Sequence, residues 1–116
     1  MNPRLRALLQ APAALGELTG AGVVTAQADN PVCGDRVHWS ARLDAAGRVV
    51  ELRYRATACP ASCVVAELAA RLVPGLRPGG PELLAAVERE LAALGGLPGR
   101  ERHALELLAE AWGRLR

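Results

Sequence analysis

Residues 36–56 read RVHWSARLDAAGRVVELRYRA, and this stretch decides the fold. On both sides of a central DAAG segment, apolar and polar residues alternate, which is the period of a β-strand with one buried face. The apolar positions of this stretch are Val37, Trp39, Ala41, Leu43, Val50, Leu52 and Tyr54. The DAAG segment is a turn, so the sequence predicts an antiparallel hairpin. The opposite side of both strands is rich in arginine, and we expect that sheet face to be solvated.

Outside the hairpin, periodicity predicts one more strand and four helices. A short helix around residues 5–9 should end at Pro12 and Gly16, and a β-branched segment at residues 22–28 should form the first strand. Helical spacing follows Pro60, Pro81 and Pro98, and the last helix should turn Leu105, Leu108, Ala109 and Trp112 inward. The sequence therefore predicts an α+β fold, in which helices pack on one face of a three-stranded antiparallel sheet.

Length and composition limit the class of protein. The 116 residues fit a single domain over 1–116, and its core must be built from Leu, Val and Ala, because Phe is absent and only three residues are aromatic. The net charge is +2 with arginines spread along the chain, so no nucleic-acid surface is expected. No apolar run approaches the roughly 20 residues that span a bilayer. Three cysteines without a disulfide pattern favour a reducing compartment, and we expect the cytoplasm.

Cysteines stand at both ends of the predicted hairpin. Cys33, Gly34 and Asp35 precede its first strand, and Cys59 follows its second. Because the two ends of a hairpin return to the same edge of the sheet, Cys33 and Cys59 can meet there. Cys59 also begins a helix, whose dipole favours the thiolate needed to bind a metal or accept sulfur.

Two thiolates and the Asp35 carboxylate leave a tetrahedral metal site one ligand short. His103 is the candidate for the fourth ligand, since it lies where the last helix begins. Cys63, one helical turn after Cys59, is the alternative, although packing in the core is its simpler interpretation. From the residues alone, ordinary structural roles for these cysteines and for the histidine stay open.

The run Asn30-Pro31-Val32-Cys33-Gly34-Asp35-Arg36 resembles the first ligand motif of the U-type iron–sulfur cluster scaffolds, above all their Gram-positive SUF branch. The hairpin, the spacing to Cys59 and the following helix match the same family, and the resemblance covers roughly residues 11–75 well. It implies a NifU-like scaffold domain that holds a nascent [2Fe-2S] cluster or a zinc ion. It also implies that Cys33 and Cys59 bind metal and accept sulfur and that Asp35 tunes the site.

The chain departs from that family at its third cysteine. No cysteine follows Cys63, and His103 takes the place of that cysteine or of the histidine before it, depending on the alignment. The implied ligands are then Cys33, Asp35, Cys59 and His103. The chaperone motif of the related ISC branch is reduced to Leu97-Pro98-Gly99-Arg100, which argues against recognition by a dedicated chaperone.

The resemblance implies a non-enzymatic scaffold that receives sulfur from a cysteine desulfurase and passes clusters to apo-proteins, as a monomer or weak dimer. Two alternatives stay open: a zinc-binding protein of the same fold with a structural or sulfur-relay role, and a paralogue that binds partners without metal. No nucleophile motif and no phosphate-binding glycine loop indicates an enzyme.

Overall fold

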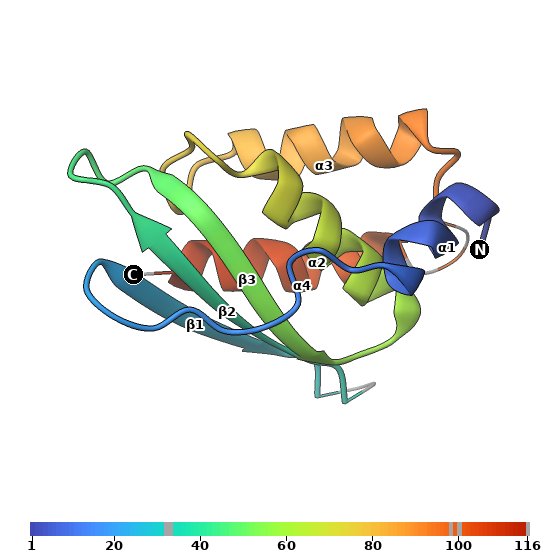
Figure 1. The fold of residues 1–116 in the computed structure, drawn as a ribbon. Coiled ribbons are helices and arrows are strands. Elements are labelled where there is room, and N and C mark those ends of the chain that lie inside the picture. The colour runs from blue at the N-terminus through green and yellow to red at the C-terminus, as the bar shows by residue number, and fades with distance from the viewer. Residues whose placement is uncertain (32–33, 98, 100, 116) are drawn as a thin grey trace.

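The computed structural model describes residues 1–31, 34–97, 99 and 101–115. Its elements in chain order are α1 (Pro3–Gln10), β1 (Val23–Asp29), β2 (Arg36–Leu43), β3 (Val49–Thr57), α2 (Pro60–Leu72), α3 (Glu82–Ala93) and α4 (Glu101–Arg114). This is the predicted order of elements, and the α+β architecture with helices against a three-stranded antiparallel sheet is confirmed (Figure 1).

The strands follow one another in the order β1-β2-β3, and both pairs are antiparallel. Trp39 sits at the centre of the sheet, opposite Ala26 of β1 and Tyr54 of β3. The β2–β3 turn is closed by Asp44, whose Oδ1 accepts the backbone N–H groups of Ala46 (2.9 Å) and Arg48 (3.0 Å). A short polar side chain that bonds its own turn explains why the hairpin reverses here.

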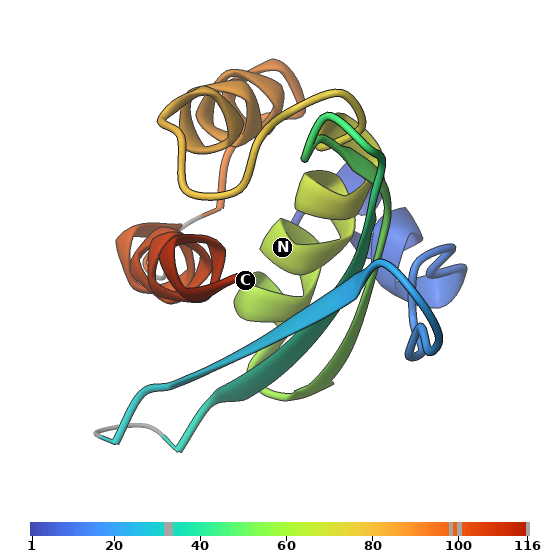
Figure 2. The same cartoon turned by 90° about the vertical axis from the view of Figure 1, so that its left-hand side faces the viewer.

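The helices α2, α3 and α4 lie on one side of the sheet (Figure 2). Helices α2 and α4 pack directly on the strands, while α3 packs on those two helices. Both predicted core tryptophans are buried, Trp39 with 1% and Trp112 with 4% of its surface exposed. Among the described helices, none is both long and apolar enough to cross a membrane.

The inward face of α4 differs from the prediction at Ala109, which is exposed. The buried positions of α4 are Ala104, Leu107, Leu108, Ala111 and Trp112, so the inner face is turned by about one residue, roughly 100°. The physical reason is an open groove of about 600 Å³ that residues of α3 and α4 line together. Both Leu105 and Ala109 line this groove, and Leu105 is half-buried against the core while Ala109 is exposed.

The arginine-rich face of the sheet, opposite the helices, was predicted to be solvated, and this prediction is wrong in part. Residues 14–16 pair with the edge strand β3, and the segment then passes over β2 on the face opposite the helices, where Leu18 reaches Ser40 (Figure 2). Tyr54 exchanges backbone hydrogen bonds with this segment, accepting from Gly16 (2.8 Å) and donating to Ala14 (3.0 Å). Ser40 is fully buried beneath it and accepts the Leu18 N–H at 2.8 Å. The segment thereby covers the outer edge of the sheet, which would otherwise expose unpaired backbone groups.

A buried glutamate of α2 anchors this N-terminal segment. Glu67 has no exposed surface, and its carboxylate accepts the N–H groups of Ala13 (3.0 Å) and Ala14 (3.2 Å) and the Tyr54 hydroxyl (3.1 Å). Glu17, at the far end of the segment, lies 3.3 Å from the His38 ring. His38 lies on the sheet face that was predicted to be solvated, yet only 32% of its side chain is exposed, because this segment covers it.

Candidate metal centre

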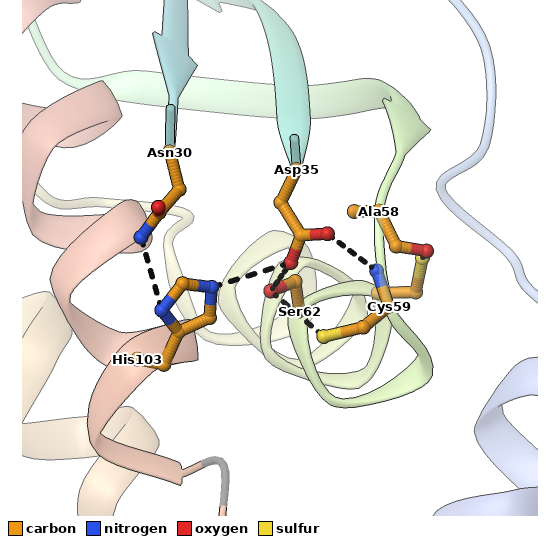
Figure 3. Close-up of polar contacts among 7 residues, drawn as sticks. Asn30, Asp35, Ala58, Cys59, Ser62 and His103 are labelled. Carbon is orange, nitrogen blue, oxygen red and sulfur yellow. Dashed lines mark hydrogen bonds and ion pairs between the residues drawn. The ribbon is translucent and has the colours of Figure 1, made fainter. Parts of the chain in front are cut away.

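Three segments that are distant in sequence meet at the end of the sheet where β1 ends and β2 begins. Asn30 follows β1, Asp35 precedes β2, Cys59 begins α2, and His103 lies in the first turn of α4 (Figure 3). The antiparallel pairing of Arg36 with Thr57 brings the end of β3 beside the start of β2. Asp35, Cys59 and His103 therefore converge at this sheet end, whereas the predicted meeting of Cys33 with Cys59 lies outside the described residues.

Asp35 lies at the centre of the cluster, with only 6% of its surface exposed. Its Oδ1 accepts the backbone N–H of Cys59 at 3.0 Å, and its Oδ2 accepts the Ser62 hydroxyl at 3.1 Å. His103 Nε2 lies 3.5 Å from the same Oδ2. Several donors around one carboxylate offset the cost of burying its charge.

Cys59 is the N-cap residue of α2, in extended conformation, and Pro60 follows in the first turn. Its own side chain makes no capping hydrogen bond, and Asp35 binds its N–H from another part of the chain instead. The thiol is half-buried, and its Sγ lies 3.5 Å from Ser62 Oγ.

His103 is half-buried, with 25% of its side chain exposed, and both ring nitrogens have partners. Nδ1 lies 3.0 Å from the Asn30 amide nitrogen, and Nε2 faces Asp35. An imidazole is thus delivered beside the carboxylate, as the position of His103 at the start of the last helix predicts.

Cys33 lies outside the described residues. Among the residues that are described, no group of three or more His, Cys, Asp or Glu side chains is arranged to hold a metal ion. The structure places the Asp35 carboxylate and the His103 ring in contact with each other. The Sγ of Cys59, a third candidate ligand, is linked to Asp35 through the Ser62 hydroxyl.

Cys63 is half-buried one turn further along α2, and its Sγ lies 3.8 Å from the carbonyl oxygen of Ala58. Burial raises the pKa of the Cys63 thiol, and the nearby Cys59 and Asp35 raise this pKa further. A thiol that holds its proton more tightly is a poorer metal ligand and a poorer nucleophile. The geometry favours Cys59 over Cys63 as the reactive thiol.

Sequence reasoning missed two residues of this cluster. Ser62 contacts both Asp35 and Cys59, and its place three residues after Cys59 in a helix was the only available signal. Asn30 was noted only as part of a motif, and its contact with His103 spans 73 positions of the sequence. No local pattern predicts a contact of that range.

The donor chemistry fits a transition metal. Thiolate, imidazole and carboxylate together suit zinc, and thiolates with histidine also bind iron–sulfur clusters. In the described part of the site, Asp35 Oδ2 accepts the Ser62 hydroxyl and lies 3.5 Å from His103 Nε2, so a metal would have to displace these contacts.

The chain is similar to known proteins over nearly its whole length. Residues 3–113 match the family model described as "NifU-like N terminal domain". A Rubrobacter xylanophilus protein named "Bifunctional protein NifU/MnmA" is 31% identical over 113 residues, which are 97% of this chain and 23% of that protein. The chain thus spans less than a quarter of that relative's length.

Two solved structures share the fold at low sequence identity. One is a candidate iron–sulfur cluster assembly scaffold protein for the SUF system from Fervidobacterium islandicum, with a TM-score of 0.68 and 14% identity over 97% of this chain and 96% of that one. The other is the N-terminal part of a nitrogen-fixing NifU-like protein from Brucella abortus, with a TM-score of 0.64 and 19% identity over 95% and 90%.

Proposed function

Because the chain belongs to the NifU-like N-terminal domain family of iron–sulfur cluster assembly scaffolds, we propose that it holds iron or a nascent cluster and hands it on. One observation carries this proposal: Asp35, Cys59 and His103 come from three different segments and meet at one end of the sheet. A cluster formed there is passed on to another protein, so the proposed role of the chain is that of a carrier and not of an enzyme that turns over a substrate.

The proposed ligands are Cys33, Asp35, Cys59 and His103. Thiolates supply the soft donors that iron–sulfur clusters prefer, and an imidazole in place of a third cysteine has precedent in cluster chemistry. Asp35 is already bound to Cys59 N–H and to Ser62, so these contacts compete with any metal for the carboxylate. Such competition suits a site that must release its cargo.

Cys59 is the proposed sulfur acceptor, and a cysteine desulfurase is the proposed donor. The Cys59 thiolate would attack the outer sulfur of the desulfurase persulfide, which leaves a persulfide on Cys59 and a thiolate on the desulfurase. The position at the N-terminus of α2 supports the nucleophile. Apo iron–sulfur proteins are the proposed acceptors, the cytoplasm is the proposed compartment, and the chain would act as a monomer or weak dimer.

A zinc site with the same four ligands is the second candidate function. It is favoured by the sequence, which carries no cysteine after Cys63 and so offers a mixed set of sulfur, nitrogen and oxygen donors. Zinc accepts such a set in tetrahedral geometry. The role would then be structural or sulfur relay.

Anaerobic reconstitution tests the scaffold proposal. The protein is incubated with ferrous iron, cysteine and a cysteine desulfurase, and cluster formation is followed by visible absorbance and circular dichroism, then transfer to an apo-ferredoxin. We expect the wild type and Cys63→Ala to form and transfer a cluster and Cys59→Ala to fail. Equal assembly by Cys59→Ala and the wild type would overturn the proposal, and zinc binding without any cluster would favour the second function.

A further inference from the structure

Asn30 contacts a proposed metal ligand, although it has no role in the function proposed above. It is half-buried directly after β1, and its side-chain amide nitrogen lies 3.0 Å from Nδ1 of His103 (Figure 3). An amide nitrogen carries only donor hydrogens, so Nδ1 must be the acceptor in this contact.

The backbone of Asn30 closes the loop that joins β1 to β2. Its N–H donates to the carbonyl oxygen of Asp35 (2.8 Å), and its own carbonyl accepts the N–H of Gly34 (2.8 Å). Gly34 has a φ of +77°, a conformation that glycine adopts without strain. One residue therefore fixes the chain around Asp35 with its backbone and reaches α4 with its side chain.

This contact determines the protonation pattern of the neutral imidazole. When Nδ1 accepts a hydrogen bond from Asn30, the ring proton resides on Nε2, which faces Asp35 Oδ2 at 3.5 Å. A metal bound through Nε2 needs the other tautomer, in which Nε2 has a free electron pair and Nδ1 carries the proton.

We infer that Asn30 is a positioning residue that directs Nε2 of His103 towards the metal and supports both of its neutral tautomers. An amide can do this because rotation by 180° exchanges its donor nitrogen for its acceptor oxygen. In the metal-free protein the nitrogen donates to Nδ1, and in the loaded protein Oδ1 would accept from Nδ1–H. This inference rests on the proposed function, because it assumes that His103 binds the metal.

The test is zinc affinity in a double-mutant cycle, measured by competition with a chromophoric chelator. Loss of a partner that orients a metal-binding histidine typically weakens metal affinity by about 10- to 100-fold. We expect this loss in Asn30→Leu and no further loss when Asn30→Leu is added to His103→Ala. Asn30→Asp, which keeps an acceptor for Nδ1–H, should bind zinc within about threefold of the wild type, far from the loss that removing the partner causes.

Gln27→Leu is the matched control. Gln27 also carries an amide, three residues earlier, but its nitrogen lies 3.3 Å from Asp29 instead of the histidine. The zinc affinity of Gln27→Leu should equal that of the wild type. The visible spectrum of the cobalt-substituted protein adds a readout of ligand geometry, which should change in Asn30→Leu and stay unchanged in Gln27→Leu.

Two results would overturn the inference. Either Asn30→Leu binds zinc as tightly as the wild type, or it weakens binding equally in the wild-type and His103→Ala backgrounds, which would mark a purely structural role for the loop. Wild-type affinity in His103→Ala would instead remove His103 from the ligand set and overturn the site assignment itself. The two failures are thus distinguishable.

Discussion

At the scale of single residues, Asp35 has two roles. It is a proposed metal ligand, and in the structure its Oδ1 also caps α2 through the N–H of Cys59. The helix has no cap from its own N-cap side chain, so this long-range contact replaces the usual local one. Substitutions of Asp35 should therefore affect stability as well as metal binding.

We predict that Asp35→Ala destabilises the metal-free protein by about 1–2 kcal/mol, the usual cost of losing a helix cap. Urea unfolding in the presence of a chelator measures this. Asp29→Ala is the control, because Asp29 is an exposed carboxylate paired with Arg36 and should leave the unfolding midpoint unchanged. A metal-free Asp35→Ala protein as stable as the wild type would contradict the capping role.

Cys63 should make stability depend on pH on the alkaline side. Its pKa is raised in the folded protein, chiefly by burial and then by Cys59 and Asp35, so the folded state holds this proton more tightly than the unfolded chain does. Its contribution to stability is present below the ordinary thiol pKa of about 8.5 and is lost as pH rises towards the raised value.

We therefore expect the unfolding free energy of the metal-free protein to fall between pH 8 and pH 10, and to fall less in Cys63→Ala. Chemical denaturation at several pH values with a reductant present measures both slopes. Identical slopes in the two proteins would show that Cys63 titrates alike in the folded and unfolded states.

At the scale of elements, the N-terminal segment depends on Glu67 of α2. Glu67→Ala would leave the N–H groups of Ala13 and Ala14 and the Tyr54 hydroxyl without their acceptor. The Ala14 N–H and the Tyr54 hydroxyl are buried, and each unsatisfied buried donor costs about 1–3 kcal/mol, so we predict a loss of at least about 2 kcal/mol.

Thermal and urea unfolding measure that loss, and hydrogen exchange should show faster exchange at residues 13–18. Glu106→Ala is the matched control, because Glu106 is largely exposed and pairs with Arg102 one turn away. The unfolding free energy of Glu106→Ala should stay within about 0.5 kcal/mol of the wild-type value. Slow exchange of residues 13–18 in Glu67→Ala would show that the segment is held by other contacts.

Element boundaries were largely predictable because the signals are local. Alternation around Trp39 and the proline at position 60 define strands and helix starts within a few residues. The covered face of the sheet was not predictable, since Ser40 is buried by Leu18 and Glu67 binds Ala13, which are contacts of long range. A buried glutamate within an apolar helix face was the one local sign that a polar partner exists.

At the scale of the whole molecule, the hairpin, α2 and α4 together create the site. Hairpin geometry predicted that Cys33 and Cys59 would meet. Cys33 lies outside the described residues, but Asp35, two positions later, does contact Cys59. The position of His103 at a helix start predicted its arrival at the same place. The roles of Ser62 and Asn30 could not be predicted, because they depend on how α2 and α4 dock on the sheet. The site is therefore a product of tertiary packing and not of a continuous motif.

Metal and acid-labile sulfide content, determined on anaerobically purified protein, tests the four-ligand site most directly. We predict about one zinc per chain in a mixed-ligand site, or iron together with acid-labile sulfide if a cluster is present. The content should fall sharply in Cys33→Ala, Asp35→Ala, Cys59→Ala and His103→Ala and persist in Cys63→Ala. A wild-type protein that carries no metal and binds neither zinc nor iron on reconstitution would contradict the account, and would leave a partner-binding paralogue without metal.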